Sequence, residues 1–145
     1  MDKISFKLGV PEAGWLPVHL VTDAFEINVD ASDVPKDPLE ELISSIILLC
    51  SNVNEPPDVM WHLEPFCYYF RFKKVNSTYL LTILSSEYYD GPKKIEFEIM
   101  GTFDSIIMPI YRGIKAFASF DYKDGLWPAI EMERIDKLKR VVTLN

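Results

Sequence analysis

Residues 66–100 read FCYYFRFKKVNSTYLLTILSSEYYDGPKKIEFEIM, and this stretch decides the fold class. Three strand-like runs are separated by residues that favour tight turns, Asn76-Ser77 and Asp90-Gly91-Pro92. Such short turns join neighbouring antiparallel strands, whereas parallel strands need a long crossover. The sequence therefore predicts an antiparallel meander. The runs are Phe66 to Lys74, Thr78 to Ser86 and Lys93 to Met100.

The segments before this stretch also have the character of strands. From Lys3 to Val10 apolar and polar residues alternate, which is the period-two pattern of a strand with one buried face. Three further runs resemble it. We therefore expect an antiparallel sheet of six or seven strands. The additional runs are Trp15 to Thr22, Ala24 to Asp30 and Val59 to Leu63.

The segment from Leu39 to Cys50 has apolar residues at helical spacing, so it should form a helix with a buried stripe. Asp37 is placed to cap this helix, and Pro38 suits its first position because the missing N–H is not needed there. Glu40 is placed to complete a capping box.

Two more helices are expected after the meander, one over residues 105–120 that Pro109 should kink or shorten, and one from Pro128 to about Val141. The predicted fold class is α+β, an antiparallel sheet of six or seven strands with two or three packed helices. At 145 residues the chain should form a single domain, 1–145. The side chains expected to be buried include Leu42, Ile46, Phe70, Phe97 and Ile110.

Composition bounds the class of protein. The chain is 48% hydrophobic, which is ordinary for a globular domain. Charges interrupt the apolar residues near the N-terminus, and the apolar run Ile46 to Cys50 is far shorter than a membrane span. We therefore expect a cytoplasmic protein that does not contact membranes. Cys50 and Cys67 lack metal-site or redox spacing and should be core thiols.

The acidic residues are concentrated in one region. Between Asp23 and Glu64 ten acids face one base, Lys36, a balance of −9, whereas the rest of the chain has twelve acids and fourteen bases, a balance of +2. Such a region repels nucleic acid and attracts a basic partner, although charge runs also serve simply to keep a surface soluble. The ten acids are Asp23, Glu26, Asp30, Asp33, Asp37, Glu40, Glu41, Glu55, Asp58 and Glu64.

Motifs for chemistry are weak. The sequence has no GxSxG, GxGxxG or P-loop, and its two histidines and two cysteines are scattered, so we expect no catalysis, no metal and no cofactor. A pocket near His62 and Glu64, belonging to a small hydrolase or ligand-binding domain, is the alternative interpretation. Paired acids such as Glu96 and Glu98 are expected to be solvated.

The strand with both aromatic and basic residues could be imagined to stack on nucleic-acid bases. The net charge of −7 argues against that interpretation. We expect instead one strand face in the core and the other in solvent. The core face would be Tyr68, Phe70 and Phe72, and the solvated face Tyr69, Arg71 and Lys73.

Three segments, Gly14 to Val18, Ser32 to Leu42 and Trp61 to Pro65, resemble the small acidic immunity proteins of bacterial polymorphic toxin systems, including those of contact-dependent growth inhibition. The resemblance covers roughly the first half of the chain. It implies a non-enzymatic cytoplasmic inhibitor that binds the toxin domain of its cognate toxin, often a nuclease.

A basic toxin domain, expected to be a nuclease, is thus the predicted partner. To bind such a partner, the acidic residues of this chain would have to lie together on one side of its fold. Aromatic anchors are expected beside them, because buried aromatic residues carry much of the affinity of an interface. Trp15 and Tyr88 or Tyr89 are further candidates. The predicted partner-binding residues are Asp30, Asp33, Asp37, Glu41, Glu55, Asp58, Trp61, His62 and Glu64.

Overall fold

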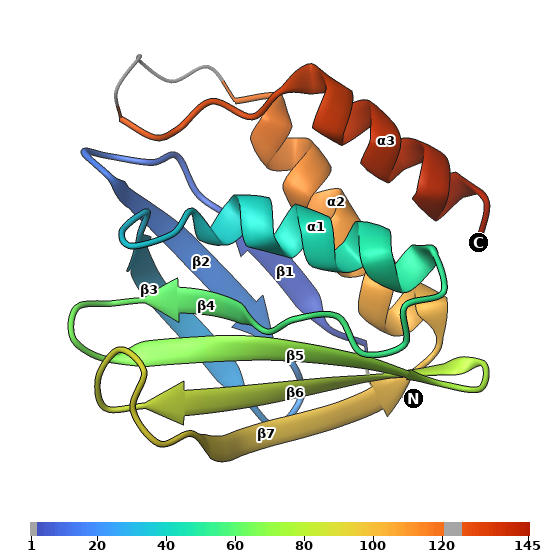
Figure 1. Cartoon of the computed structure of the whole chain (residues 1–145), viewed down its shortest axis with the longest axis horizontal. Helices are drawn as coiled ribbons and strands as arrows, with labels where there is room; N and C mark the ends of the chain where they lie inside the picture. The colour runs from blue at the N-terminus through green and yellow to red at the C-terminus, as the bar shows by residue number, and fades with distance from the viewer. Residues whose placement is uncertain (1–2, 121–125) are drawn as a thin grey trace.

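The computed structural model describes residues 3–120 and 126–145. Seven strands form one antiparallel sheet in chain order, and the helices lie together on one side of it (Figure 1). The predicted α+β class and the meander are confirmed. The elements are β1 (Ser5–Leu8), β2 (Trp15–Val21), β3 (Glu26–Ser32), α1 (Pro38–Cys50), β4 (Val59–His62), β5 (Cys67–Val75), β6 (Thr78–Ser86), β7 (Lys94–Gly101), η1 (Phe103–Ile107), α2 (Met108–Ala118) and α3 (Met132–Thr143).

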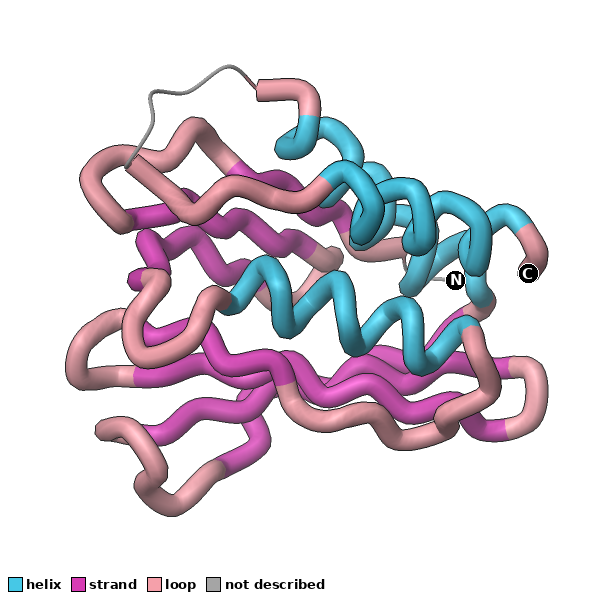
Figure 2. The backbone as a smooth tube through the Cα atoms, turned by 45° about the horizontal axis from the view of Figure 1, so that its top comes forward, coloured by secondary structure: helices cyan, strands magenta, loops and turns pink. Residues whose placement is uncertain are grey.

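The sheet is divided into two halves. Strands β3 and β4 are joined through a single residue pair, Ser32 with His62, whereas β5 and β6 pair from Cys67 to Val75 along their whole length. In Figure 2, α1 lies between the strands of the first half and those of the second. Phe25 stacks on Phe97 of β7, with ring centroids 4.9 Å apart, and so connects the two halves. The core therefore lies between a strongly bent sheet and the helices.

Helix α1 begins as the sequence predicts. Asp37 Oδ1 accepts hydrogen bonds from the N–H of Leu39 at 2.9 Å and of Glu40 at 3.4 Å, and Pro38 stands in the first turn. The Glu40 side chain does not complete the expected capping box within the described residues. Its Oε1 instead accepts a hydrogen bond from Arg134 Nε of α3 at 2.8 Å, because α3 packs on α1.

The two later helices differ from expectation at their starts. The segment expected as one helix over 105–120 begins with the π-helical turn η1, capped by Thr102 and Ser105, and continues as α2. Pro109 lies in the first turn of α2, so it separates the two segments as its missing N–H predicts. Helix α3 begins at Met132 rather than Pro128, because Glu131 is still extended.

The hydrophobic core contains four of the five side chains expected there, Leu42, Ile46, Phe70 and Ile110, all fully buried. Phe97 is only partly buried, because it lies on the edge strand β7 and its cover is the Phe25 ring. Both cysteines are free thiols. Burial raises the pKa of the Cys50 thiol to about 11.

The prediction that Tyr69 belongs to a solvated strand face was wrong. Tyr69 is 4% exposed and clusters with Met60, Cys67 and Leu84 on the face of the sheet opposite the main core. The Lys93 ammonium lies 4.1 Å above the Tyr69 ring, and the Tyr69 hydroxyl is hydrogen-bonded to Ser86 Oγ at 2.9 Å. Arg71 and Lys73, on the same strand face, are exposed as expected.

Candidate partner-binding site

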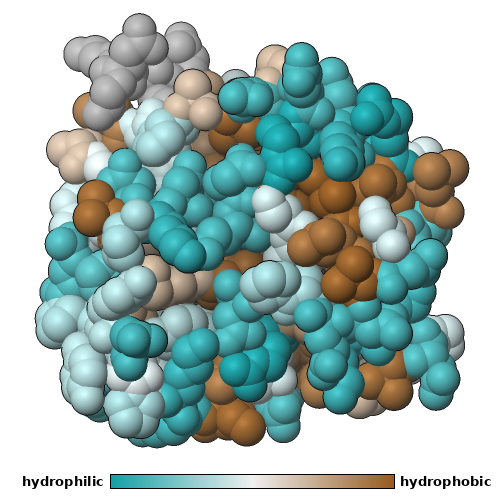
Figure 3. All heavy atoms as spheres, viewed as in Figure 1, coloured by the Kyte–Doolittle hydropathy of each residue, from teal (hydrophilic) through white to brown (hydrophobic). Residues whose placement is uncertain are grey.

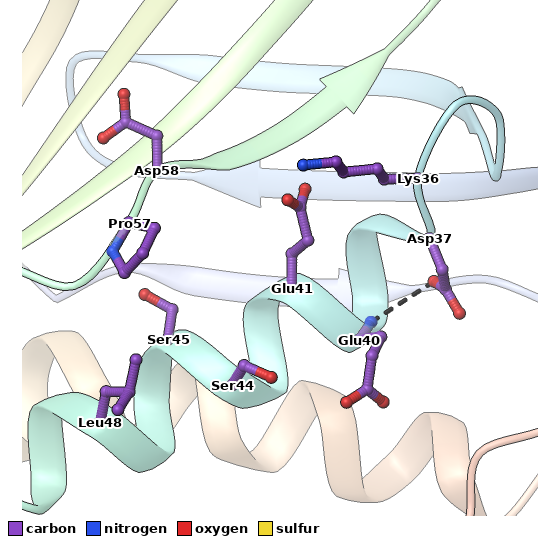
Figure 4. A pocket seen from close by; sticks show the side chains of 9 residues that line it. All are labelled: Lys36, Asp37, Glu40, Glu41, Ser44, Ser45, Leu48, Pro57 and Asp58. Atoms are coloured by element: carbon purple, nitrogen blue, oxygen red, sulfur yellow. Dashed lines mark hydrogen bonds between the residues drawn. The ribbon is translucent and has the colours of Figure 1, made fainter.

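A hollow of about 530 Å³ lies between α1 and the chain that leads into β4. We call it the α1 hollow. Figure 4 shows carboxylates from α1 and its flanking segments, two serine hydroxyls of α1, an apolar pair formed by Leu48 and Pro57, and one cation, Lys36, that points toward Glu41. Its lining residues are Lys36, Asp37, Glu40, Glu41, Ser44, Ser45, Leu48, Pro57 and Asp58.

Much of the regional acidity is compensated by bases from elsewhere in the chain. Three of the ten acids form ion pairs with lysine or arginine in the described structure, and every base that pairs with them lies outside the acidic stretch. The local balance counted from the sequence therefore overstates the negative field at the surface. The pairs are Glu40 with Arg134 at 2.8 Å, Glu55 with Lys73 at 3.3 Å, and Asp58 with Arg71 at 2.9 Å and Lys93 at 2.8 Å. Glu26 is in addition hydrogen-bonded to His19 Nε2 at 2.6 Å.

Asp58 is the most strongly held of these acids. Its two oxygens accept from Arg71 Nε and Nη2, both at 2.9 Å, and Oδ2 also accepts from Lys93 Nζ. Burial acts to raise the pKa of Asp58, but the hydrogen bonds and charges of Arg71 and Lys93 outweigh it and hold the pKa below its usual value. Asp58 thus ties the loop before β4 to β5 and to the start of β7, and its charge is already neutralised.

The acids with charge to offer are near the start of α1. Asp37 is partly buried, and this burial raises its pKa against the two N–H groups that it caps, with Glu40 and Asp33 adding repulsion. Glu41 Oε1 accepts from the backbone N–H of Met60 at 3.1 Å, which holds its carboxylate between α1 and β4. Within the described residues neither Asp37 nor Glu41 forms an ion pair. Figure 4 shows the Glu41 carboxylate beside Lys36, whereas the Asp37 carboxylate is turned toward the N–H groups that it caps.

A second, smaller hollow of about 180 Å³ adjoins the first and shares Lys36, Glu41 and Asp58 with it. We call it the tyrosine hollow, because Tyr69 and the 51% exposed Tyr89 both line it. Exposed aromatic surface therefore lies directly beside the acids of α1.

The His62 ring packs edge to face against the Tyr89 ring, with the ring centroids 6.2 Å apart. Its Nδ1 donates to the carbonyl oxygen of Val34 at 2.9 Å, so it fixes the loop that precedes α1. Glu64 is exposed in the turn between β4 and β5. The α1 hollow and the tyrosine hollow are lined by other residues, so the pocket of the alternative interpretation does not coincide with either.

The other predicted contacts divide into two groups. Asp37, Glu41 and Asp58 come together in the α1 hollow, and Asp33 is close enough to Asp37 to affect its pKa. Glu55 lines a third hollow of about 400 Å³ that also includes Asp58.

Two predicted contacts lie away from these hollows. Asp30 is exposed on β3, paired with Pro17 of β2. Trp61 is no partner contact: it is 1% exposed and packs between Phe6 and Phe70 in the core, because its strand position faces inward. Trp15, by contrast, is 38% exposed at the start of β2.

Sequence reasoning missed the serines of the site. Glu40 with Ser44 and Glu41 with Ser45 each have the i, i+4 spacing that places two side chains on one helix face, and this spacing was a usable signal. No local pattern indicated that Arg134 and Lys93 would join them. These residues reach the site only through tertiary packing.

Two further observations concern the whole described chain. No three His, Cys, Asp or Glu side chains in residues 3–120 and 126–145 come together as a metal-binding group. In the same residues, no helix has the length and apolar character needed to cross a membrane. Comparisons with protein-family models, curated proteins and solved structures found no match.

Proposed function

We propose that this protein is an immunity protein that binds a basic toxin domain, expected to be a nuclease, and neutralises it through the surface around the α1 hollow. One observation carries the proposal. Asp37 and Glu41, two carboxylates outside the ion pairs of the described structure, line the same hollow. Their charge is therefore available to an incoming partner, unlike that of Asp58.

The chemistry of a nuclease makes it a suitable partner. A nuclease must carry lysines and arginines to hold phosphates, so an acidic surface can engage the residues that would hold its substrate. Complementary charge also increases the rate of association, because the summed field steers the encounter over about a Debye length. This steering requires only a few uncompensated acids on one side of the domain. Asp33, Asp37 and Glu41 supply them near the start of α1.

Exposed aromatic and apolar groups provide the short-range part of the interface. Tyr88 is 55% exposed, Tyr89 is 51% exposed and Val34 is 59% exposed. Tyrosine is enriched in interfaces because it buries a large area with few rotatable bonds. Tyr89 lines the tyrosine hollow and Val34 binds His62 through its carbonyl, so these groups lie next to the acids. The proposed surface therefore combines charge for steering with anchors for affinity.

The face seen in Figure 1 is mostly hydrophilic, and its hydrophobic groups gather on the right-hand side of Figure 3, the side of the C-terminal end of α1. Asp37 and Glu41 belong to the other end of the helix. The hydrophobic groups on that side of Figure 3 therefore lie toward the opposite end of α1 from Asp37.

Co-expression with the toxin domain encoded beside this gene tests the proposal. The test variant is Asp33→Asn, Asp37→Asn, Glu41→Gln, which removes three charges. An asparagine at position 37 can still cap α1, and a glutamine at position 41 can still accept from the Met60 N–H. A matched variant, Asp23→Asn, Asp104→Asn, Glu133→Gln, removes three exposed charges elsewhere.

Protection from the toxin should fall in the first variant and persist in the second. Full protection by both folded variants would contradict the proposal.

A further inference from the structure

Ser45 has an unusual position on the floor of the α1 hollow. The residue is 3% exposed, and its Oγ is buried without a hydrogen-bond partner among the described residues. Figure 4 shows the hydroxyl directed to the side of α1 on which Pro57 and Asp58 lie, into the hollow. Buried hydroxyls are normally paired, since an unpaired one loses its bonds to water without replacement. The hollow therefore contains a polar group that a ligand can satisfy.

The adjacent helix position shows which ligand suits such a group. Glu40 and Ser44 are four residues apart, and together they bind the guanidinium of Arg134: Nε donates to Glu40 Oε1 and Nη2 donates to Ser44 Oγ. Glu41 and Ser45 repeat the same pair of side chains one position further along α1. The first pair is occupied by an arginine of α3, and the second pair faces the hollow.

We propose that the α1 hollow receives the guanidinium of an arginine side chain from the basic partner, with the Glu41 carboxylate binding the cation and Ser45 Oγ accepting one hydrogen bond. This inference rests on the proposed function and names the group that the partner inserts. Arginine fits better than lysine because its planar fork has several donors in fixed directions, whereas an ammonium is a compact point charge.

The rest of the lining suits the remainder of an arginine side chain. Leu48 and Pro57 offer apolar surface to its methylene groups, which remain hydrophobic even though the head is charged. Glu41 uses Oε1 for the Met60 N–H, so Oε2 is the oxygen that it directs to the ligand.

Two charged residues of the lining have other roles. Asp58 contributes little to binding of the guanidinium, because its carboxylate is already paired with Arg71 and Lys93. Lys36 is the resident competitor and has to move aside, which its exposed position allows.

The test uses the full chain and the probe N-acetyl-arginine methylamide, followed by shifts of backbone amide resonances in NMR. We expect saturable shifts at residues 41–48 and at Met60. The citrulline analogue, which has the same shape without the charge, should produce none at these positions, and the lysine analogue should bind more weakly.

Four variants separate the arginine site from a general charge effect. Glu41→Gln should lower the affinity for the arginine probe by about tenfold, and Ser45→Ala should lower it by about three- to tenfold, as expected when a charged hydrogen bond is lost. Lys36→Met should raise the affinity for the probe by about threefold, because a competing cation is removed. Ser51→Ala is the matched control and should leave the affinity unchanged, since Ser51 is exposed just after α1 and does not line the hollow.

Equal binding of the citrulline probe, or equal effects of Ser51→Ala and Ser45→Ala, would overturn the inference. Because the titration needs no toxin, its failure is distinct from failure of the proposed function. If the arginine probe does not bind but the Asp33, Asp37 and Glu41 variant still loses protection, the inferred arginine site is wrong and the proposed function stands. If the probe binds and that variant protects fully, the inferred arginine site stands and the proposed function is wrong.

Discussion

At the scale of single residues, the polar groups near α1 differ in whether the fold satisfies them. Ser44 and Ser45 are neighbours on α1, yet Ser44 Oγ accepts from Arg134 while Ser45 Oγ has no partner among the described residues. Asp58 and Asp37 contrast in the same way. Asp58 is held by two cations, whereas Asp37 accepts only from the two backbone N–H groups that it caps. The groups that we assign to binding are therefore a buried hydroxyl without a partner and carboxylates without a cation partner among the described residues.

Replacing Ser45 by Ala should stabilise the free protein. The change removes a buried unpaired hydroxyl and introduces a better helix former, so we expect the free energy of unfolding to rise by about 1 kcal/mol. Urea denaturation of the two proteins measures this difference. Ser44→Ala should have the opposite sign, because it leaves an Arg134 donor unpaired. A destabilised Ser45→Ala protein would show that its hydroxyl has an internal partner in solution.

The two aspartates should give opposite pH dependences. The pKa of Asp58 is lowered in the folded state, so its ionised form contributes stability that is present at neutral pH and is lost as pH falls through the folded pKa, below 3.8. The destabilisation caused by Asp58→Asn should therefore shrink in acid. The pKa of Asp37 is raised, so its contribution is present at low pH and is lost as pH rises through the folded pKa, above 3.8. Asp37→Asn should gain stability relative to the original protein over that rise, and parallel curves for both variants in urea denaturation would contradict these assignments.

At the scale of elements, close packing of α2 against β1 fixes one end of the helical layer. A Cβ added at Gly113 would lie 2.6 Å from Phe6 Cδ2 and 2.8 Å from the Phe6 carbonyl oxygen. The ring can shift, but the carbonyl belongs to a paired strand. Gly113 therefore permits a helix-to-strand approach that any larger residue would widen.

Gly113→Ala should destabilise the protein despite its better helix propensity. Ala gains about 1 kcal/mol over Gly in a helix interior, while overpacking of this kind costs about 1–3 kcal/mol and backbone contact places it at the upper end. We expect a net loss of roughly 1–2 kcal/mol in thermal or urea unfolding. Adding Phe6→Leu should restore only part of the loss, because the carbonyl contact remains. Unchanged or increased stability would mean that α2 moves away from β1 without cost.

At the scale of the whole molecule, the sequence predicts what is local and misses what depends on distant partners. The meander and α1 followed from alternation, turn residues and a capping aspartate, all within a few neighbours. The burial of Tyr69 did not, since its cover comes from Lys93. The charge of the acidic stretch was overstated for the same reason: Arg71, Lys93 and Arg134 reach Asp58 and Glu40 only in the folded chain.

The candidate site could likewise be predicted only where it depends on residues close together in the sequence. Helical spacing places Asp37, Glu41 and Ser45 along one helix, so their proximity could have been predicted. The hollow itself could not, because its opposite wall is formed by Pro57 and Asp58, whose position depends on how β4 joins the sheet. Trp61 shows the limit of side-chain type as a guide: a tryptophan suits an interface or a core, and only strand pairing decides which face it takes.

The most direct test of the central claim is the association rate constant with the toxin domain, measured by stopped flow at several salt concentrations. The original protein should associate more slowly as salt rises. The Asp33→Asn, Asp37→Asn, Glu41→Gln variant should associate about tenfold more slowly at low salt and show a weaker salt dependence. The matched Asp23→Asn, Asp104→Asn, Glu133→Gln variant should remain close to the original. Identical rates and salt dependences for all three proteins would contradict the claim that the acids at the start of α1 engage a basic partner.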